Sequence, residues 1–218
     1  MYQPKHFMES RPQVLQDLMQ SHPLATVVWQ GAEGLTAEHL PLLWQAEGAH
    51  GVLIGHVARA NPVWRQAEGA AVMAVFHGPQ HYISPNWYPS KAENHKAVPT
   101  WNYAVVHAHG RLVVMDDADT KRLIVSQLTQ VHERTQAQPW QVSDAPPDYI
   151  AQMLHAIVGV RVVIERLEGK WKTSQNQTPV NREGVVTGLQ GMAQCADAPS
   201  DALRMATLVQ PHGAEAGR

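Results

Sequence analysis

Short runs rich in apolar and β-branched residues, separated by polar turn residues, dominate the first third of the chain. Residues 24–30, 35–43, 51–57 and 70–77 all have this strand-like pattern. Strands that follow one another at such short intervals are typical of a small antiparallel barrel. The pattern therefore predicts a protein that is mainly β.

Helices are predicted on either side of these strands. Ser10 and Gln13 have the spacing of a capping box, and the apolar positions after them predict a helix that ends at His22-Pro23. Further helices are predicted at three places: after Asp117 or Asp119, from Pro146-Pro147, and over residues 182–192.

Two longer strands are predicted in the second half of the chain. Residues 103–115 alternate, with Val106 and Leu112 on one face and His107 on the other. Residues 157–167 alternate in the same way. Fold class is thus expected to be mainly β with peripheral helices.

Residues 78–102 have no clear period. A stretch of this length inside a compact domain is usually a functional loop or a flexible one. Tyr82, Trp87, Tyr88 and Trp101 lie within it, and disordered segments are poor in aromatic residues. We therefore expect an ordered loop that contributes to a binding site.

Composition and charge narrow the class further. The chain has 218 residues, of which 44% are apolar, so one large domain can form. We expect this domain to span residues 1–192 and the alanine-rich residues 193–218 to form a loosely held tail.

The sequence contains no run of about 18 apolar residues, so no transmembrane helix is predicted. The first residues lack an apolar signal core, and the single cysteine, Cys195, fits a reducing compartment, so we expect a cytoplasmic protein without membrane contact.

The segment 55–64 is a candidate anion site. It leaves a predicted strand, and His56, Arg59 and Asn61 supply donors that suit a phosphate. Asn61-Pro62 is also an ordinary turn and helix-start signal. The segment alone leaves both interpretations open.

Five strings of residues carry a resemblance to a known family. They are His39-Leu40-Pro41, GHVARANPVW (55–64), FHGPQHYISPNWY (76–88), VPTWNYAVVHAHG (98–110) and IVGVRVVIERLEGKWKTSQN (157–176). In this order they closely resemble the PaiB family, which is similar to the FMN-binding split barrels. The resemblance implies a six-stranded Greek-key split β-barrel that forms a two-fold homodimer, with FMN in grooves between the subunits.

The resemblance also implies a set of cofactor-binding residues. Those expected near the flavin phosphate are Gly55, His56, Val57, Arg59 and Asn61. Those expected along the flavin ring are His39, Leu40, Pro41, Trp87, Trp101 and Asn102. Those expected to complete the groove, from the same or the other subunit, are Lys172, Ser174, Gln175 and Asn176. No residue is singled out as a catalytic acid or base.

Three functions are compatible with these observations. The first is a flavin-dependent redox or sensing protein. The second is a regulator of transcription, as members of the family have been described, with DNA or another regulatory partner. The net charge of −2 opposes direct DNA contact, because phosphate neutralisation needs a basic surface. The third is a binding module whose grooves are filled by its own side chains.

Thirteen histidines raise the question of a metal site. His77 and His81 are four residues apart, and His107 and His109 share a strand face, both plausible ligand spacings. Neither pair comes with a nearby Cys, Asp or Glu pattern that names a metal, so no metal is expected.

Overall fold

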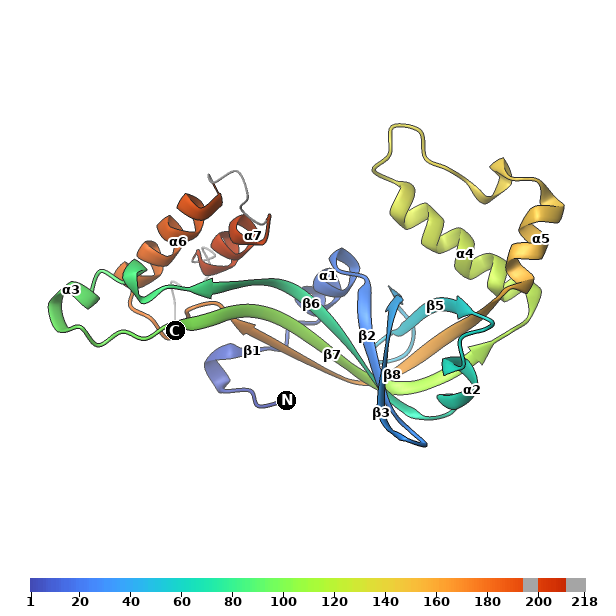
Figure 1. Cartoon of the computed structure of the whole chain (residues 1–218), viewed down its shortest axis with the longest axis horizontal. Coiled ribbons are helices and arrows are strands. Elements are labelled where there is room, and N and C mark those ends of the chain that lie inside the picture. The colour runs from blue at the N-terminus through green and yellow to red at the C-terminus, as the bar shows by residue number, and fades with distance from the viewer. Residues whose placement is uncertain (194–199, 211–218) are drawn as a thin grey trace. The chain divides into compact units, whose positions relative to one another are not determined.

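The computed structural model describes residues 1–193 and 200–210, which form two compact units. We call them the terminal unit (residues 1–11, 77–106 and the chain from 168 onward) and the central unit (residues 12–76 and 107–167). Figure 1 labels their elements.

All the strands belong to one antiparallel sheet. They are β1 (Met8–Glu9), β2 (Leu24–Gly31), β3 (Gly34–Pro41), β4 (Leu43–Gln45), β5 (Val52–Ala58), β6 (Ala71–Ile83), β7 (Thr100–Met115) and β8 (Ile157–Lys172). Their order is β3-β2-β6-β7-β8-β5-β4, and β1 pairs with β8. The long strands β6, β7 and β8 each contribute residues to both units.

Each unit also contains helices. The central unit contains α1 (Pro12–Ser21), α2 (Val63–Gln66), α4 (Ala118–Glu133), η3 (Val142–Asp144) and α5 (Pro147–His155). The terminal unit contains η1 (Lys5–Phe7), η2 (Pro85–Trp87), α3 (Lys91–Asn94), α6 (Pro179–Ala193) and α7 (Ser200–Val209). Among the described residues, no helix is long and apolar enough to cross a membrane. The fold is thus mixed α+β with a large antiparallel sheet, and closure into a six-stranded barrel stays a prediction.

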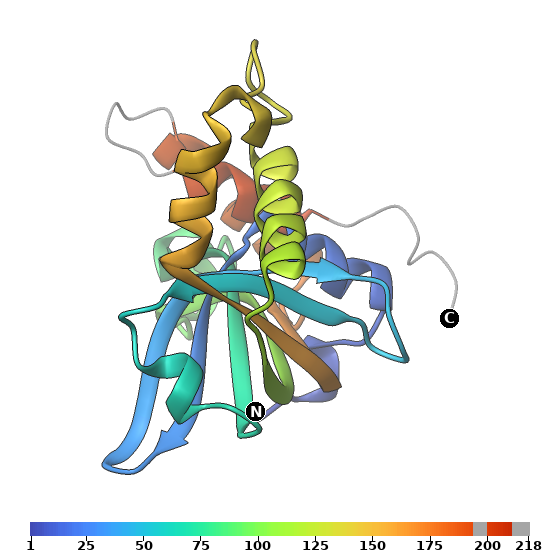
Figure 2. The ribbon, with the colours of Figure 1, turned by 90° about the vertical axis from the view of Figure 1, so that its right-hand side faces the viewer.

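Helix α4 covers one face of the central unit's strands. Ile124 and Leu128 pack against Val52 and Ile54 of β5, while α5 lies beside α4 (Figure 2). Of the two candidate capping residues, Asp117 caps α4 by accepting a hydrogen bond from the Thr120 N–H, and Asp119 lies in the first turn.

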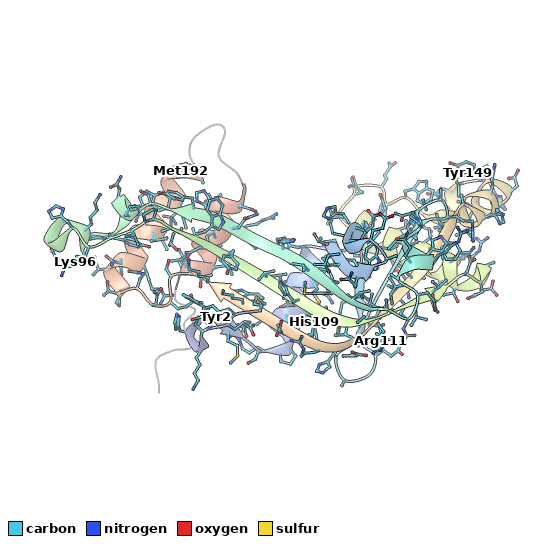
Figure 3. The ribbon with its side chains drawn as sticks, turned by 60° about the horizontal axis from the view of Figure 1, so that its bottom comes forward. Tyr2, Lys96, His109, Arg111, Tyr149 and Met192 are labelled. Atoms are coloured by element: carbon cyan, nitrogen blue, oxygen red, sulfur yellow. The ribbon has the colours of Figure 1, made fainter. Side chains whose placement is uncertain are left out.

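The terminal unit has a separate apolar core. Ile83 and Tyr88 pack there with Val185 and Leu189 of α6 and Met205 of α7. Figure 3 labels Met192 near the end of α6 and Lys96 beyond α3. The core is formed by the irregular segment after β6 and by the two last helices.

The structure differs from the sequence-based expectation in the predicted loop and in the predicted tail. Residues 78–83 extend β6 instead of forming a loop. Helix α7 lies in the predicted loose tail, yet its Ala202, Met205, Ala206 and Val209 are buried. Their i, i+3, i+4, i+7 spacing gives one apolar face, which small alanines make easy to overlook. The tail's other residues, 194–199 and 211–218, lie outside the described part of the chain.

Candidate functional site

In the central unit, the segments 39–41 and 55–57 lie together. A Cβ on Gly55 would stand 2.7 Å from the Pro41 carbonyl oxygen, so only glycine permits this approach. Leu40 and Val57 are buried in the core and have little side-chain surface for a ligand. His39 is exposed on β3. The predicted ring-facing strand and the predicted phosphate segment are therefore neighbours.

His56 lies on the opposite face of β5 from Gly55, because side chains alternate along a strand. It shares that face with Ile54, which packs under α4. Burial lowers the pKa of His56, and its Nδ1 atom is buried with no hydrogen-bond partner in the described residues. His56 therefore lies on the face covered by α4, where burial disfavours its charged form, and its predicted phosphate contact gains no support.

The Arg59 side chain links Asp116, shortly before α4, to the backbone at the end of α5. Its Nη1 and Nη2 atoms donate to the two Asp116 carboxylate oxygens at 2.9 and 2.5 Å, and Nε donates to the His155 carbonyl at 2.7 Å. Nη2 also donates to the Ile157 carbonyl at 2.9 Å. A guanidinium has five N–H groups, so one is left for any ligand.

Asp116 lies between two cations. Hydrogen bonds from Arg59 and from Lys121, whose Nζ is 2.9 Å away, hold the pKa of this carboxyl well below its usual range. Asn61 is also engaged: its Nδ2 donates to Glu38 at 2.6 Å, and its Oδ1 accepts the Val63 N–H. The polar groups of the predicted phosphate segment thus mainly serve the fold.

The terminal unit contains a pocket of about 230 Å³ with polar walls. Four predicted site residues line it: Asn102, Lys172, Ser174 and Asn176. Its other walls come from the segment after η2 and from the start of α6. Strand alternation explains part of this arrangement, because Thr100 and Asn102 point to the same face of β7.

Asn102 is the most informative residue of the pocket. Its side chain is 1% exposed, and Nδ2 donates to the Ser174 hydroxyl at 2.9 Å. The Oδ1 atom has no hydrogen-bond partner in the described residues. An unpaired buried acceptor costs free energy, so this oxygen is expected to accept a hydrogen bond from a bound group.

Lys172 places a cation beside Asn102. Its Nζ donates to the Thr100 hydroxyl and, at 2.9 Å, to the Trp101 carbonyl. An ammonium has three N–H groups, so one is left. The pKa of Lys172 is lowered, mainly by burial. The charge of Tyr103 raises this pKa and the charge of Lys170 lowers it. No carboxylate pairs with Lys172 within the described ranges.

The pocket loop is held by its own side chains. Gln175 accepts the Thr173 N–H through Oε1 at 2.8 Å and donates from Nε2 to the Trp171 carbonyl at 2.6 Å. Ser174 takes a left-handed backbone conformation, with φ of 65°, which is strained for a residue other than glycine. Gln175 thus shapes the loop and does not line the pocket, unlike its predicted role.

Neither predicted tryptophan lines this pocket. Trp87 packs against α6, where a Cβ on Gly188 would stand 2.3 Å from the indole ring. Trp101 lies on the opposite face of β7 from Asn102 and is 48% exposed. Its ring meets that of Tyr82 edge-on, with the ring centroids 6.2 Å apart. Trp87 therefore fills space in the core, as the third hypothesis allows, whereas Trp101 is available at the surface.

Sequence reasoning missed several pocket residues. Thr100, Ser90 and Asn181 line it, and Asn181 Oδ1 accepts the Ser90 N–H at 3.3 Å. Asn181 begins a helix far along the chain, and only its burial (6% exposed) sets it apart from an ordinary surface residue. No sequence pattern indicates that position.

Two solved structures show the fold that this chain resembles. The chain resembles the FAD and heme binding protein from Mycobacterium smegmatis, with a TM-score of 0.57 and 17% identity over 76% of this chain and 73% of that one. The flavocytochrome Anf3 from Azotobacter vinelandii gives a TM-score of 0.55 and 12% identity over 76% and 69%. The fold is thus similar to that of flavin-binding split-barrel proteins.

Sequence relatives define the family. The chain belongs to the PaiB family, described as "Putative FMN-binding domain", which matches residues 1–166. The Bacillus subtilis protein named protease synthase and sporulation protein PAI 2 is 31% identical over 87% of this chain and 89% of its own length. An uncharacterized protein from Emericella nidulans is 30% identical over 84% and 88%. The predicted family is confirmed.

Proposed function

We propose that this chain is a homodimeric FMN-binding protein that uses the flavin for redox chemistry or sensing in a regulatory role. The observation that carries the proposal is the pocket of the terminal unit, where a buried acceptor lies beside a cation, and the described residues provide neither a donor for the first nor a carboxylate for the second. Membership of the PaiB family supports flavin as the ligand.

The pocket fits the pyrimidine edge of a flavin better than a phosphate. That edge carries an N–H between two carbonyl groups, so it both donates and accepts hydrogen bonds. The N–H suits Asn102 Oδ1, and a carbonyl suits the remaining N–H of Lys172. A phosphate at neutral pH offers mainly acceptors and would leave Asn102 Oδ1 unpaired.

The size of the pocket agrees with this assignment. At about 230 Å³ it is smaller than the roughly 300 to 1,000 Å³ of pockets that enclose a whole small ligand. It therefore takes one end of the flavin. FMN would supply electron transfer, while Asn102 fixes the orientation of the edge and Lys172 favours any state that places negative charge there.

A second copy of the chain provides the remaining ring contact. Trp101 of β7 and Tyr82 of β6 are exposed aromatic side chains, and both lie on the face of these strands that is turned away from the pocket. They cannot line the pocket of their own chain, because strand alternation directs Trp101 and Asn102 oppositely. A two-fold homodimer would offer them to a partner's ligand.

Titration of the purified full chain with FMN tests the proposal. We expect quenching of flavin fluorescence, a yellow protein after gel filtration, and a mass by light scattering of twice the chain's 24.1 kDa. Absence of both quenching and retained colour would contradict flavin binding. A flavin-bound monomer would contradict the dimer alone.

The regulatory part of the proposal rests on the relative named for protease synthesis and sporulation. Because the chain's net charge is −2, we expect its influence on transcription to operate without direct DNA contact. Promoter DNA titrated at low salt should show no binding. Tight binding that weakens steeply with added salt would contradict this expectation.

A further inference from the structure

A larger groove lies in the central unit, between α4 and the segment that leads into α5. Its volume is about 800 Å³, within the range of pockets that take a complete small ligand. Figure 2 shows α4 and α5 side by side with the connecting segment above them. None of the predicted flavin residues lines this groove, so it is separate from the proposed flavin pocket.

One wall of the groove is a polar stripe on α4. Arg122, Ser126, Gln130 and Arg134 follow one another at intervals of four residues, which places them on one face of the helix. The face that carries Ile124 and Leu128 packs against β5 instead. The polar stripe is therefore turned away from the sheet and toward the groove.

The opposite wall is mainly apolar. It contains Pro139, Trp140, Val142 and Ile150. Trp140 is 43% exposed, and its backbone N–H donates to Glu133 Oε2 at 3.0 Å, which ties this segment to the end of α4. An aromatic ring and aliphatic side chains thus face a row of polar groups.

The two ends of the groove differ in charge. Among the described residues that line it, Glu133 is the single acid, and it lies next to Arg134 in the sequence, so charge is balanced at that end. Arg122 lies eleven residues earlier, about 16 Å away along the helix. In the part of the chain that the structure describes, no acidic side chain pairs with Arg122, so its guanidinium is the unbalanced charge of the groove.

We propose that this groove binds a small organic carboxylate with an apolar body. The carboxylate lies at Arg122, where a planar guanidinium can donate two parallel hydrogen bonds. The apolar body lies along the groove toward Trp140 and Val142. Binding here does not require flavin.

Calorimetric titration with 4-phenylbutyrate tests the proposal on the full chain, with and without saturating FMN. We expect saturable binding with one site per chain in both conditions. The matched neutral probe, 4-phenylbutan-1-ol, has the same ring and chain without the charge and should bind more weakly by about tenfold. Because the assay does not depend on FMN, its failure is distinguishable from failure of the proposed flavin function.

Variants assign the two ends of the groove. Arg122→Gln should weaken 4-phenylbutyrate binding by about tenfold or more and leave the alcohol unchanged. Arg134→Gln, on the same helix face, serves as the matched control and should have a smaller effect. Trp140→Ala should weaken both probes. Lack of saturable 4-phenylbutyrate binding in the millimolar range would overturn the proposal. The proposal would also be overturned if the Arg122→Gln variant bound 4-phenylbutyrate as tightly as the unmodified chain does.

Discussion

Two regions of the molecule come from the same set of family motifs and use their polar residues in opposite ways. In the central unit, four of the five N–H groups of Arg59 are hydrogen-bonded within the protein, and both ends of the Asn61 amide are engaged. In the terminal unit, Asn102 keeps a buried oxygen without a partner in the described residues, and Lys172 has no carboxylate partner there.

The difference teaches how to separate supporting residues from binding residues within one motif set. Buried polar groups are nearly always hydrogen-bonded in folded proteins. A motif residue whose hydrogen bonds are all made inside the protein is explained by the fold. A motif residue with an unused buried donor or acceptor that faces a pocket is a candidate for ligand binding. By this criterion Asn102 is the flavin-binding candidate, with Lys172 beside it in the same pocket. His56 Nδ1 also lacks a partner in the described residues, but it lies on the face of β5 that α4 covers, and Arg59 mainly stabilises the α4–α5 region.

The largest effect is expected from Lys172→Met. A charge-assisted hydrogen bond is worth enough to change FMN affinity by about 10- to 100-fold, so the dissociation constant should rise by that factor in a fluorescence titration. Lys170→Met is the matched control, because Lys170 lies over Tyr2 and Tyr103 and does not line the pocket. Equal losses in both variants would show that only the general positive field matters.

The pH dependence of FMN affinity should reveal the same lysine. Lys172 has a lowered pKa in the free protein, so it loses its proton, and its attraction for a negative group, at a lower pH than an ordinary lysine. The ratio of affinities between the unmodified chain and Lys172→Met should therefore shrink as pH rises through this pKa, below the ordinary value of 10.5. A ratio that stays constant through alkaline pH would contradict the assignment.

A smaller effect is expected from Asn102→Leu. This change removes a neutral acceptor of similar size, so FMN affinity should fall by about three- to tenfold. The free protein should lose some stability, because the buried Ser174 hydroxyl loses its hydrogen bond, and removal of the unpaired oxygen offsets part of this loss. A thermal melt of the free protein provides the control, and unchanged FMN affinity would remove Asn102 from the site.

The smallest effect on FMN is expected from Arg59→Lys. A lysine keeps the charge but cannot make the paired contact with Asp116 and the two carbonyl contacts at once. The melting temperature should fall while FMN affinity changes less than about twofold, since a single N–H is left for a ligand. A large loss of affinity with unchanged melting would return Arg59 to the flavin site.

Local sequence patterns predicted the regular elements well. Alternation in residues 103–115 and a capping residue at Asp117 both correspond to observed elements, because these signals depend on neighbours along the chain. Leu123 continues the apolar pattern of α4 next to Ile124 but is 56% exposed, because the stripe that faces β5 is narrower than the apolar pattern. Helix α7 was missed because its buried face consists partly of alanines.

The site could be predicted only in part. The resemblance selected Asn102, Lys172 and Ser174, which the fold gathers in one pocket. It also selected Arg59, whose partner Asp116 lies 57 residues away and is not indicated by any local pattern. Which polar groups are already paired is decided by long-range contacts, so sequence alone could not rank these residues.

A nuclear magnetic resonance spectrum of the protein bound to ¹⁵N-labelled FMN tests the central claim most directly. We predict that the flavin ring N–H between the two carbonyls gives a resonance protected from exchange with water, and that Asn102→Leu abolishes this protection. Rapid exchange of that proton in the saturated complex, or protection that persists in the Asn102→Leu variant, would contradict the account.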